Sequence, residues 1–143
     1  MFKKILLPVD RPDYDQKTLE VVKDMALKYN SEVVIFNSQD LSPNIYWVND
    51  PVMMNRTPIN NEDFSRDIVS KVANFFKDTG IKITESTSIG DPASEILHLT
   101  ENDETIDILI MSTHGMTTTK RFLLGSVTNK VVHHVKIPVL IIR

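Results

Sequence analysis

Apolar residues recur along the chain in two alternating patterns, continuous short runs and longer runs with helical spacing. Continuous apolar runs are typical of strands that are covered on both faces of a sheet. We therefore predict strands in five segments, which are KKILLPVD, SEVVIFNS, IKITESTSI, IDILIMS and IPVLIIR. The third segment alternates apolar with polar residues, so we place it near a sheet edge. The first and fourth segments are the most apolar, so we place them at the centre.

Four segments with helical spacing lie between these strands. In the first, Asp15–Tyr29, the aspartate suits the N-cap position. In the third, GDPASEILHLTEN, Asp91 suits the cap and Pro92 the first helical position. The last is GSVTNKVVHHV. This alternation of strands with helices predicts parallel strands joined by right-handed crossovers.

The second helical segment is NEDFSRDIVSKVANFFKDTG. Its spacing places Phe64, Ile68, Val72 and Phe75 on one face, and Gly80 is the expected stop. A long irregular stretch with three prolines precedes it and carries Trp47, Tyr46 and two methionines. That stretch covers the ligand site, packs on a partner or forms a minor core, and sequence leaves these alternatives open.

The predicted fold class is α/β, as one domain over residues 1–143. We expect a single doubly wound open sheet of five parallel strands, in the order 3-2-1-4-5, with helices on both faces. A net charge of −3 argues against a nucleic-acid partner. No cysteine is present, which excludes a disulfide framework and thiolate metal ligands. No segment reads as a signal peptide or a membrane span, so we expect a cytoplasmic protein with no membrane partner.

Polar residues follow the first and fourth strands, in PVD and IMSTHG. In an open parallel sheet, ligands bind beyond the carboxyl ends of the strands, where the winding direction reverses. If the first and fourth strands are neighbours, these two ends face one another across a single crevice. The sequence therefore predicts the ligand site at this point of the sheet.

Two of the four glycines, Gly115 and Gly125, lie in the loop after the fourth strand. Glycine lets backbone amides approach an anion, and Gly125–Ser126 stands at the start of the last helix. The free amides of Ser126, Val127 and Thr128 would then form a phosphate site. The alternative is a plain loop in which Gly115 makes a turn and the Ser126 hydroxyl only caps the helix.

These residues resemble the universal stress protein family, in its nucleotide-binding branch. The resemblance runs from KKILLPVD to PVLIIR and is strongest in DILIMSTHG, LLGSV and IPVLIIR. The family signature is glycine, two residues, glycine, nine residues, glycine, then serine or threonine. Gly115, the nine following residues and Gly125–Ser126 match its last two glycines and its hydroxyl.

The resemblance implies that ATP, with Mg, binds in the crevice. It implies that Asp10 lies near the base and ribose, with Ser38 against adenine. Pro8 and Val9 would line the pocket beside Asp10, and Met111 and Ser112 would lie along the nucleoside. The residues implied around the phosphates are Gly115, Gly125, Ser126 and Val127. Without the resemblance, the favoured interpretation of Asp10 is a strand-end residue that caps the following turn.

Ser112 stands where the signature has its first glycine. A positive φ at this position would strain serine. Otherwise its hydroxyl adds a hydrogen-bonding group, and the site binds nucleotide with altered affinity. The alternative is an interaction module whose nucleotide site has decayed at Ser112.

The resemblance and the short apolar last strand both favour a homodimer. An edge strand with unpaired amides invites a second chain, and we expect pairing through Val139 to Ile142. The sequence predicts no catalytic residue and no metal site of its own. Asp10 and His114 are the only evident bases for a slow ATPase, and no Walker-type lysine follows Gly125. The function expected is that of a nucleotide-sensing stress regulator with a protein partner of unknown identity.

Overall fold

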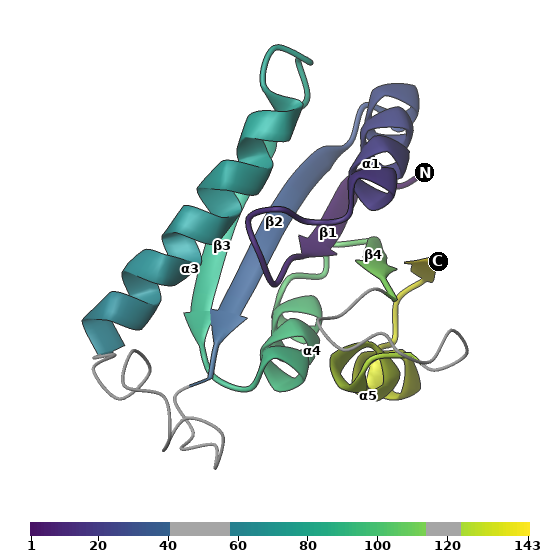
Figure 1. Ribbon diagram of the computed structural model, residues 1–143. Helices are drawn as coiled ribbons and strands as arrows, with labels where there is room; N and C mark the ends of the chain where they lie inside the picture. Colours follow the sequence, from purple (N-terminus) through teal and green to yellow (C-terminus); the bar gives the residue numbers. More distant parts are fainter. Residues whose placement is uncertain (41–57, 114–123) are drawn as a thin grey trace.

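The computed structural model describes residues 1–40, 58–113 and 124–143. The stretch around Trp47 lies outside the described residues, as do His114 and Gly115. Five parallel strands form one sheet in the order β3-β2-β1-β4-β5, which confirms the predicted order (Figure 1). The strands are β1 (Lys4–Pro8), β2 (Glu32–Gln39), β3 (Ile83–Ile89), β4 (Ile108–Ser112) and β5 (Val139–Ile142).

Helices cover both faces of the sheet. They are α1 (Gln16–Tyr29), α3 (Pro58–Ala73), α4 (Pro92–Asn102) and α5 (Ser126–His134). Buried residues of α1 and α3, such as Val22 and Ile68, pack with Ile110 of β4 on one face. Leu109 packs on the other face with Val131 of α5 and with α4. Because neighbouring residues of a strand point to opposite faces and both faces are covered, β4 is apolar from Ile108 to Met111.

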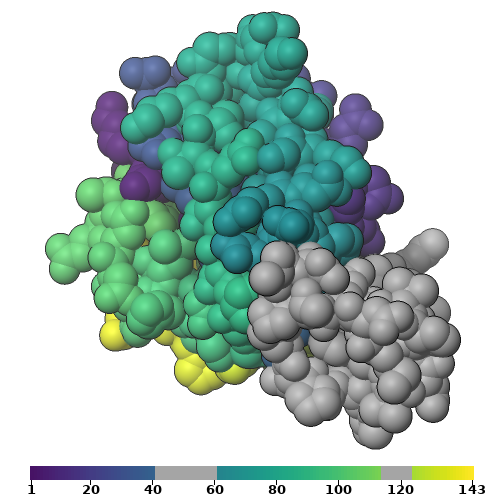
Figure 2. Space-filling model, turned by 90° about the vertical axis from the view of Figure 1, so that its left-hand side faces the viewer, coloured from purple at the N-terminus to yellow at the C-terminus, as the bar shows by residue number. Residues whose placement is uncertain are grey.

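The centre and the edges of the sheet differ in burial as the sequence predicts. All five residues of β4 are buried, and β1 pairs directly with it through Ile5–Ile108 and Leu6–Leu109. No residue of β3 is fully buried. Viewed from the β3 side, the molecule shows the surfaces of α3 and α4 on either side of this strand (Figure 2). The alternating segment therefore forms an edge strand.

The two predicted helix caps are present. The Asp15 carboxylate accepts a hydrogen bond from the Thr18 amide at 2.9 Å at the start of α1. The Asp91 carboxylate accepts from the Ser94 amide at 2.9 Å, and Pro92 begins α4. Each carboxylate satisfies an amide that the helix itself leaves without a partner.

The predicted boundaries and inner face of the second helical segment are partly wrong. α3 begins at Pro58 and ends at Ala73, before the glycine that was expected to stop it, and a 3₁₀ turn continues it over Asn74–Phe76. This tighter turn has about three residues per turn and rotates the following side chains relative to an α-helix. As a result Phe76 is buried and Phe75 is only half-buried. Phe64, which lies earlier in α3, is exposed.

Asp91 also joins α4 to α5. The Lys130 ammonium of α5 lies 3.0 Å from the Asp91 carboxylate and 3.0 Å from the Ser94 hydroxyl. The hydrogen bonds from Ser94 and then from Lys130 lower the pKa of Asp91 from 3.8 to about 2. The pair therefore ties the first turn of α4 to the second turn of α5.

The ionised form of Asp91 stabilises the fold above its unfolded pKa, and this contribution is lost as the pH falls towards 2. Asp91→Asn keeps a capping oxygen but does not titrate. We expect its free energy of unfolding to fall less steeply than that of the wild type between pH 4 and pH 2, measured by urea unfolding. Asp24→Asn, on the exposed side of α1, is the matched control, and equal slopes for Asp91→Asn and the wild type would contradict the assignment.

Candidate functional site

A cavity of about 290 Å³ lies beyond the carboxyl ends of β1, β2 and β4, where the starts of α4 and α5 approach the sheet. This is the predicted crevice between the ends of the two central strands. Nine of the ten predicted site residues line it, and Gly115 lies outside the described residues. The nine are Pro8, Val9, Asp10, Ser38, Met111, Ser112, Gly125, Ser126 and Val127.

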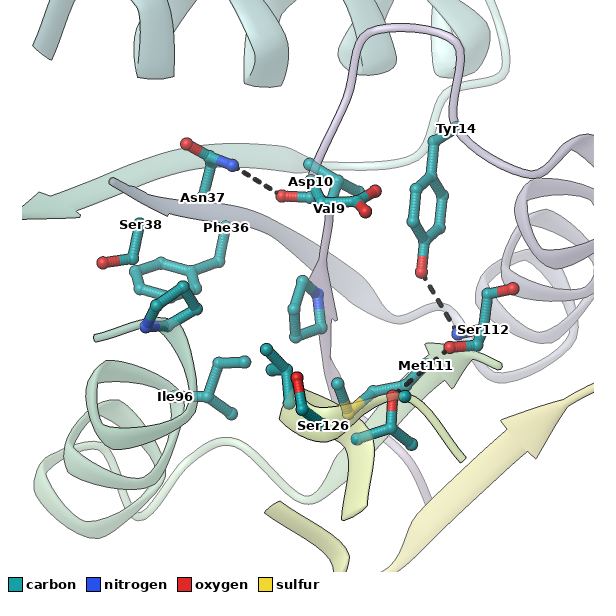
Figure 3. Close-up of a pocket in the computed structure, with 15 residues that line it drawn as sticks. Val9, Asp10, Tyr14, Phe36, Asn37, Ser38, Ile96, Met111, Ser112 and Ser126 are labelled. Atoms are coloured by element: carbon teal, nitrogen blue, oxygen red, sulfur yellow. Dashed lines mark hydrogen bonds between the residues drawn. The ribbon is translucent and has the colours of Figure 1, made fainter. Parts of the chain in front are cut away.

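The two ends of the cavity differ in character. Figure 3 shows Phe36, Ser38 and Ile96 gathered at one end, with Tyr14 and Ser112 at the other. Phe36 and Ile96 belong to the apolar core between the sheet and α4. The first end thus offers apolar side chains for a flat ring, and the second offers polar groups.

The start of α5 points amides at the cavity. Gly125 is the N-cap residue, none of the side chains that the structure describes caps this helix, and the first intrahelical bond runs from the Asn129 amide to the Gly125 carbonyl. Ser126 is the first helical residue, so the alternative in which its hydroxyl caps the helix is wrong. Amides of a first helical turn have no intrahelical acceptor, and their dipoles favour an anion. Ser126, Val127 and Thr128 all border the cavity.

Gly125 leaves room at this helix start. Its φ is −58°, and no described atom lies within 4 Å of the position that a Cβ would take. Neither backbone conformation nor crowding by described atoms therefore requires glycine here. The absent side chain leaves space on the cavity wall beside the free amides.

Ser112 is not strained. It is the last residue of β4, it is buried, and its φ is not positive. Its side chain lies on the α1 side of the sheet, because Met111 before it packs on the opposite side. A serine fits this backbone as well as a glycine does, so the sequence-based concern about strain is resolved.

The family model for universal stress proteins matches residues 1–143. This chain belongs to the universal stress protein family. The universal stress protein MJ0577 of Methanocaldococcus jannaschii is 31% identical over all of this chain and 96% of its own length. The solved structure of MJ0577 has a TM-score of 0.76 to this chain at 30% identity, covering 99% of this chain and 96% of that one.

Two more distant solved structures share the fold of this universal stress protein. One is a universal stress protein in complex with cAMP, at 20% identity and a TM-score of 0.69, covering 99% of this chain and 97% of that one. The other is the Archaeoglobus fulgidus protein in complex with dAMP, at 14% identity and a TM-score of 0.66, covering 99% and 98%.

Tyr14 is a cavity residue of this universal stress protein that the sequence analysis missed. It lies between β1 and α1 and is 9% exposed, and its hydroxyl accepts a hydrogen bond from the Ser112 amide at 3.1 Å (Figure 3). Burial raises the pKa of Tyr14 to about 12. The hydroxyl therefore keeps its proton throughout the physiological range.

Asn37 is a second missed residue, and it supports the cavity from behind. Its amide donates to the Val9 carbonyl at 2.7 Å, and its side-chain oxygen accepts from Ser65 at 2.6 Å and Gln39 at 2.8 Å. These bonds occupy the side chain of Asn37, which is only 3% exposed. A polar residue inside the apolar run of β2 was the available signal, because buried amides need partners.

Asp10 follows β1 and lies at the mouth of the cavity. The residue as a whole is exposed. Desolvation of the carboxyl group by the surrounding protein raises the pKa of Asp10 above its usual value. The positive charge of the Arg11 guanidinium counteracts part of this rise. The remaining cavity residues that sequence did not predict are Phe36, Pro92 and Ile96. The Thr128 hydroxyl lies 3.5 Å from the Ser112 carbonyl, which brings the end of β4 against the first turn of α5.

The described part of the chain has no group of three or more acidic or histidine side chains arranged to hold a metal ion. None of the helices described is long and apolar enough to traverse a bilayer. Among the described cavity residues there is no lysine or arginine. Positive potential on the described wall therefore comes from the amides of α5.

Replacing Asn37 with leucine tests the support behind the cavity. The change keeps the volume but leaves the Val9 carbonyl without its partner, while the Ser65 hydroxyl keeps only the backbone carbonyl of residue 37 as an acceptor. We expect Asn37→Leu to lower the free energy of unfolding by about 1–3 kcal/mol, the cost of a buried polar group left unpaired. Chemical denaturation measures this.

Asn102→Leu is the control, because the Asn102 amide also donates to a backbone carbonyl, that of His98, but on the exposed side of α4. We expect a change below about 0.5 kcal/mol there. Equal losses in the two variants would show that Asn37 has no special structural role.

Proposed function

We propose that this universal stress protein binds ATP with Mg in the cavity and acts as a dimeric cytoplasmic regulator that passes its nucleotide state to a protein partner. The observation that carries the proposal is the set of free amides at the start of α5, facing the end of β1 across a cavity with an apolar end. A chain without cysteine suits a reducing compartment.

The backbone of Ser38 suits the edge of a purine base. The Phe36 carbonyl accepts from the Val9 amide at 2.8 Å, so the polar groups of Phe36 face β1. The backbone polar groups of successive residues point to opposite sides of a strand, so those of Ser38, two residues after Phe36, also face the β1 side. The last pair with β1 is Pro8–Phe36, and these two groups lie beyond it. A neighbouring donor and acceptor match the N1 and N6 edge of adenine.

The side chain of Ser38 holds this arrangement in place. Its hydroxyl donates to the Gly90 carbonyl at 2.8 Å and so connects β2 to the turn before α4. Asp10, at the mouth, offers carboxylate oxygens that accept from ribose hydroxyls. The base would then lie between Phe36 and Ile96, and the ribose would lie towards Asp10.

The phosphates fit the amides of Ser126, Val127 and Thr128, with the space at Gly125 beside them. Since the described wall supplies neither a cation nor an acidic metal cluster, the charge of Mg would come with the nucleotide. The related proteins in complex with cAMP and dAMP support an adenine nucleotide as the class of ligand.

Gly125→Ala tests the phosphate site. The backbone at Gly125 accepts alanine without strain, so the unfolding temperature should stay within about 2 °C of the wild type. The added methyl group intrudes on the ligand, and we expect the affinity for ATP with magnesium to fall at least about tenfold in titration calorimetry. The absence of heat or thermal shift with wild-type protein at millimolar ATP would end the proposal.

Gly80→Ala is the matched control with the opposite pattern. Gly80 has a φ of +77° and lies in the turn before β3. Alanine is strained at this φ, so the free energy of unfolding should fall by about 1–3 kcal/mol. ATP affinity should remain that of the wild type, because the residue does not line the cavity.

The proposed dimer pairs β5 of one copy with β5 of another. β5 is an edge strand, and Val139, Leu140 and Ile141 are only half-buried. The Pro138 carbonyl accepts from Leu109 of β4, and the Ile142 carbonyl accepts from Thr113, the residue after β4. Every second residue of β5 therefore faces β4. The polar backbone groups of Val139 and Ile141 therefore face outwards, where a second chain completes the ladder.

Ile141→Pro removes one outward amide and spares the bonds to β4. We expect the wild type to show twice the chain mass of 16.3 kDa in light scattering at micromolar concentration, and Ile141→Pro to show the monomer. Ile89→Pro makes the same change on the outward side of the other edge strand, β3, and should stay dimeric. A monomeric wild type would contradict the dimer.

A further inference from the structure

Tyr14 and Ser112 form a pair that closes the polar end of the cavity. The phenol oxygen of Tyr14 accepts the Ser112 amide at 3.1 Å, and both residues line the cavity. Ser112 stands where the signature of the family has a glycine. The amide at the end of β4 is therefore already bonded to Tyr14 and is not presented to a ligand.

The hydrogen of the Tyr14 hydroxyl remains as a donor at this end of the cavity. A tyrosine hydroxyl has one O–H donor besides the oxygen that accepts. Among the residues that the structure describes, no acceptor bonds to this hydrogen. Because Tyr14 is buried against the cavity, an acceptor in a ligand would relieve the cost of an unpaired donor.

The position of this donor relative to α5 indicates what it meets. The Ser112 carbonyl lies against Thr128 in the first turn of α5, the turn that offers amides to phosphate. Figure 3 shows Tyr14 at the end of the cavity away from Phe36, Ser38 and Ile96, with its hydroxyl directed to Ser112. A nucleotide with its base at the apolar end therefore places its ribose or phosphate oxygens near Tyr14.

We propose that Tyr14 is a specificity-determining residue whose O–H donates to a ribose hydroxyl or phosphate oxygen of the bound nucleotide. The Ser112 N–H, the Tyr14 hydroxyl and the ligand oxygen then form a chain of hydrogen bonds. This inference rests on the proposed nucleotide function and adds to it the group that recognises the sugar–phosphate part. Since burial keeps Tyr14 protonated far above neutral pH, the donor is present at any physiological pH.

Tyr14→Phe keeps the ring and removes only the hydroxyl. Its affinity is compared with that of the wild type for ATP, 2′-deoxy-ATP, 3′-deoxy-ATP and adenosine by titration calorimetry. We expect a loss of about tenfold for ATP, the effect of one hydrogen bond to an oxygen of the ligand. If the acceptor is a ribose hydroxyl, the loss vanishes for the deoxynucleotide that lacks it. If the acceptor is a phosphate, the loss persists for all three triphosphates and vanishes for adenosine.

Tyr29→Phe is the matched control, because Tyr29 lies at the end of α1 with its ring against Phe2 and does not line the cavity. Its affinities should equal those of the wild type. Unchanged ATP affinity in Tyr14→Phe, or an equal loss for all four ligands, would overturn the inference and leave Tyr14 a structural residue. Failure of the wild type to bind any of the four would instead refute the proposed function.

Discussion

β1 and β4 pair at the centre of the sheet, and the groups of the site depend on that pairing. From β1 the chain continues outwards to β2 and β3 on one side of the sheet, and from β4 it continues to β5 on the other side. The winding direction therefore reverses between the two central strands. The helices that follow them, α1 and α5, lie on opposite faces. A gap is left at the carboxyl ends, and the residues after β1 and β4 border it. The order of strands and helices that covers both central strands on both faces thus also fixes where polar residues gather, at the ends of these strands.

Buried polar side chains hold the walls of this gap. The Val9 backbone is bonded at its amide by Phe36 and at its carbonyl by Asn37, so the exit of the chain from β1 has a fixed direction. On the other side the Ser112 amide is held by Tyr14. Such groups are costly to bury unless each has a partner, which favours a single arrangement of the cavity walls. The cavity is consequently preorganised by the same bonds that satisfy the strand ends.

Helix caps and the ends of the central strands could be predicted because each depends on local pattern, and the strand order followed from the two most apolar strands and the rules for doubly wound sheets. Asp15 and Asp91 cap helices through amides three residues away, and neighbours in sequence carry that information. The sequence analysis placed Phe75 on the inner face of the helix, whereas the structure buries Phe76. Helical periodicity does not predict the change to a 3₁₀ turn that turns Phe76 inwards. Tyr14 was missed because its partner, Ser112, is 98 positions away, and no local pattern pairs them.

In the proposed function, the amides at the start of α5 hold the phosphates of the nucleotide. Amides at a helix start are fixed dipoles that stabilise the charge already present on a phosphate. The ion pair between Lys130 and Asp91 joins α5 to the start of α4. A ligand bound to the amides of α5 would therefore act on the position of α5 relative to α4. α5 is followed directly by β5, the strand with outward-facing backbone groups. A ligand on the first turn of α5 is therefore connected, through one helix, to the edge at which a second chain would pair.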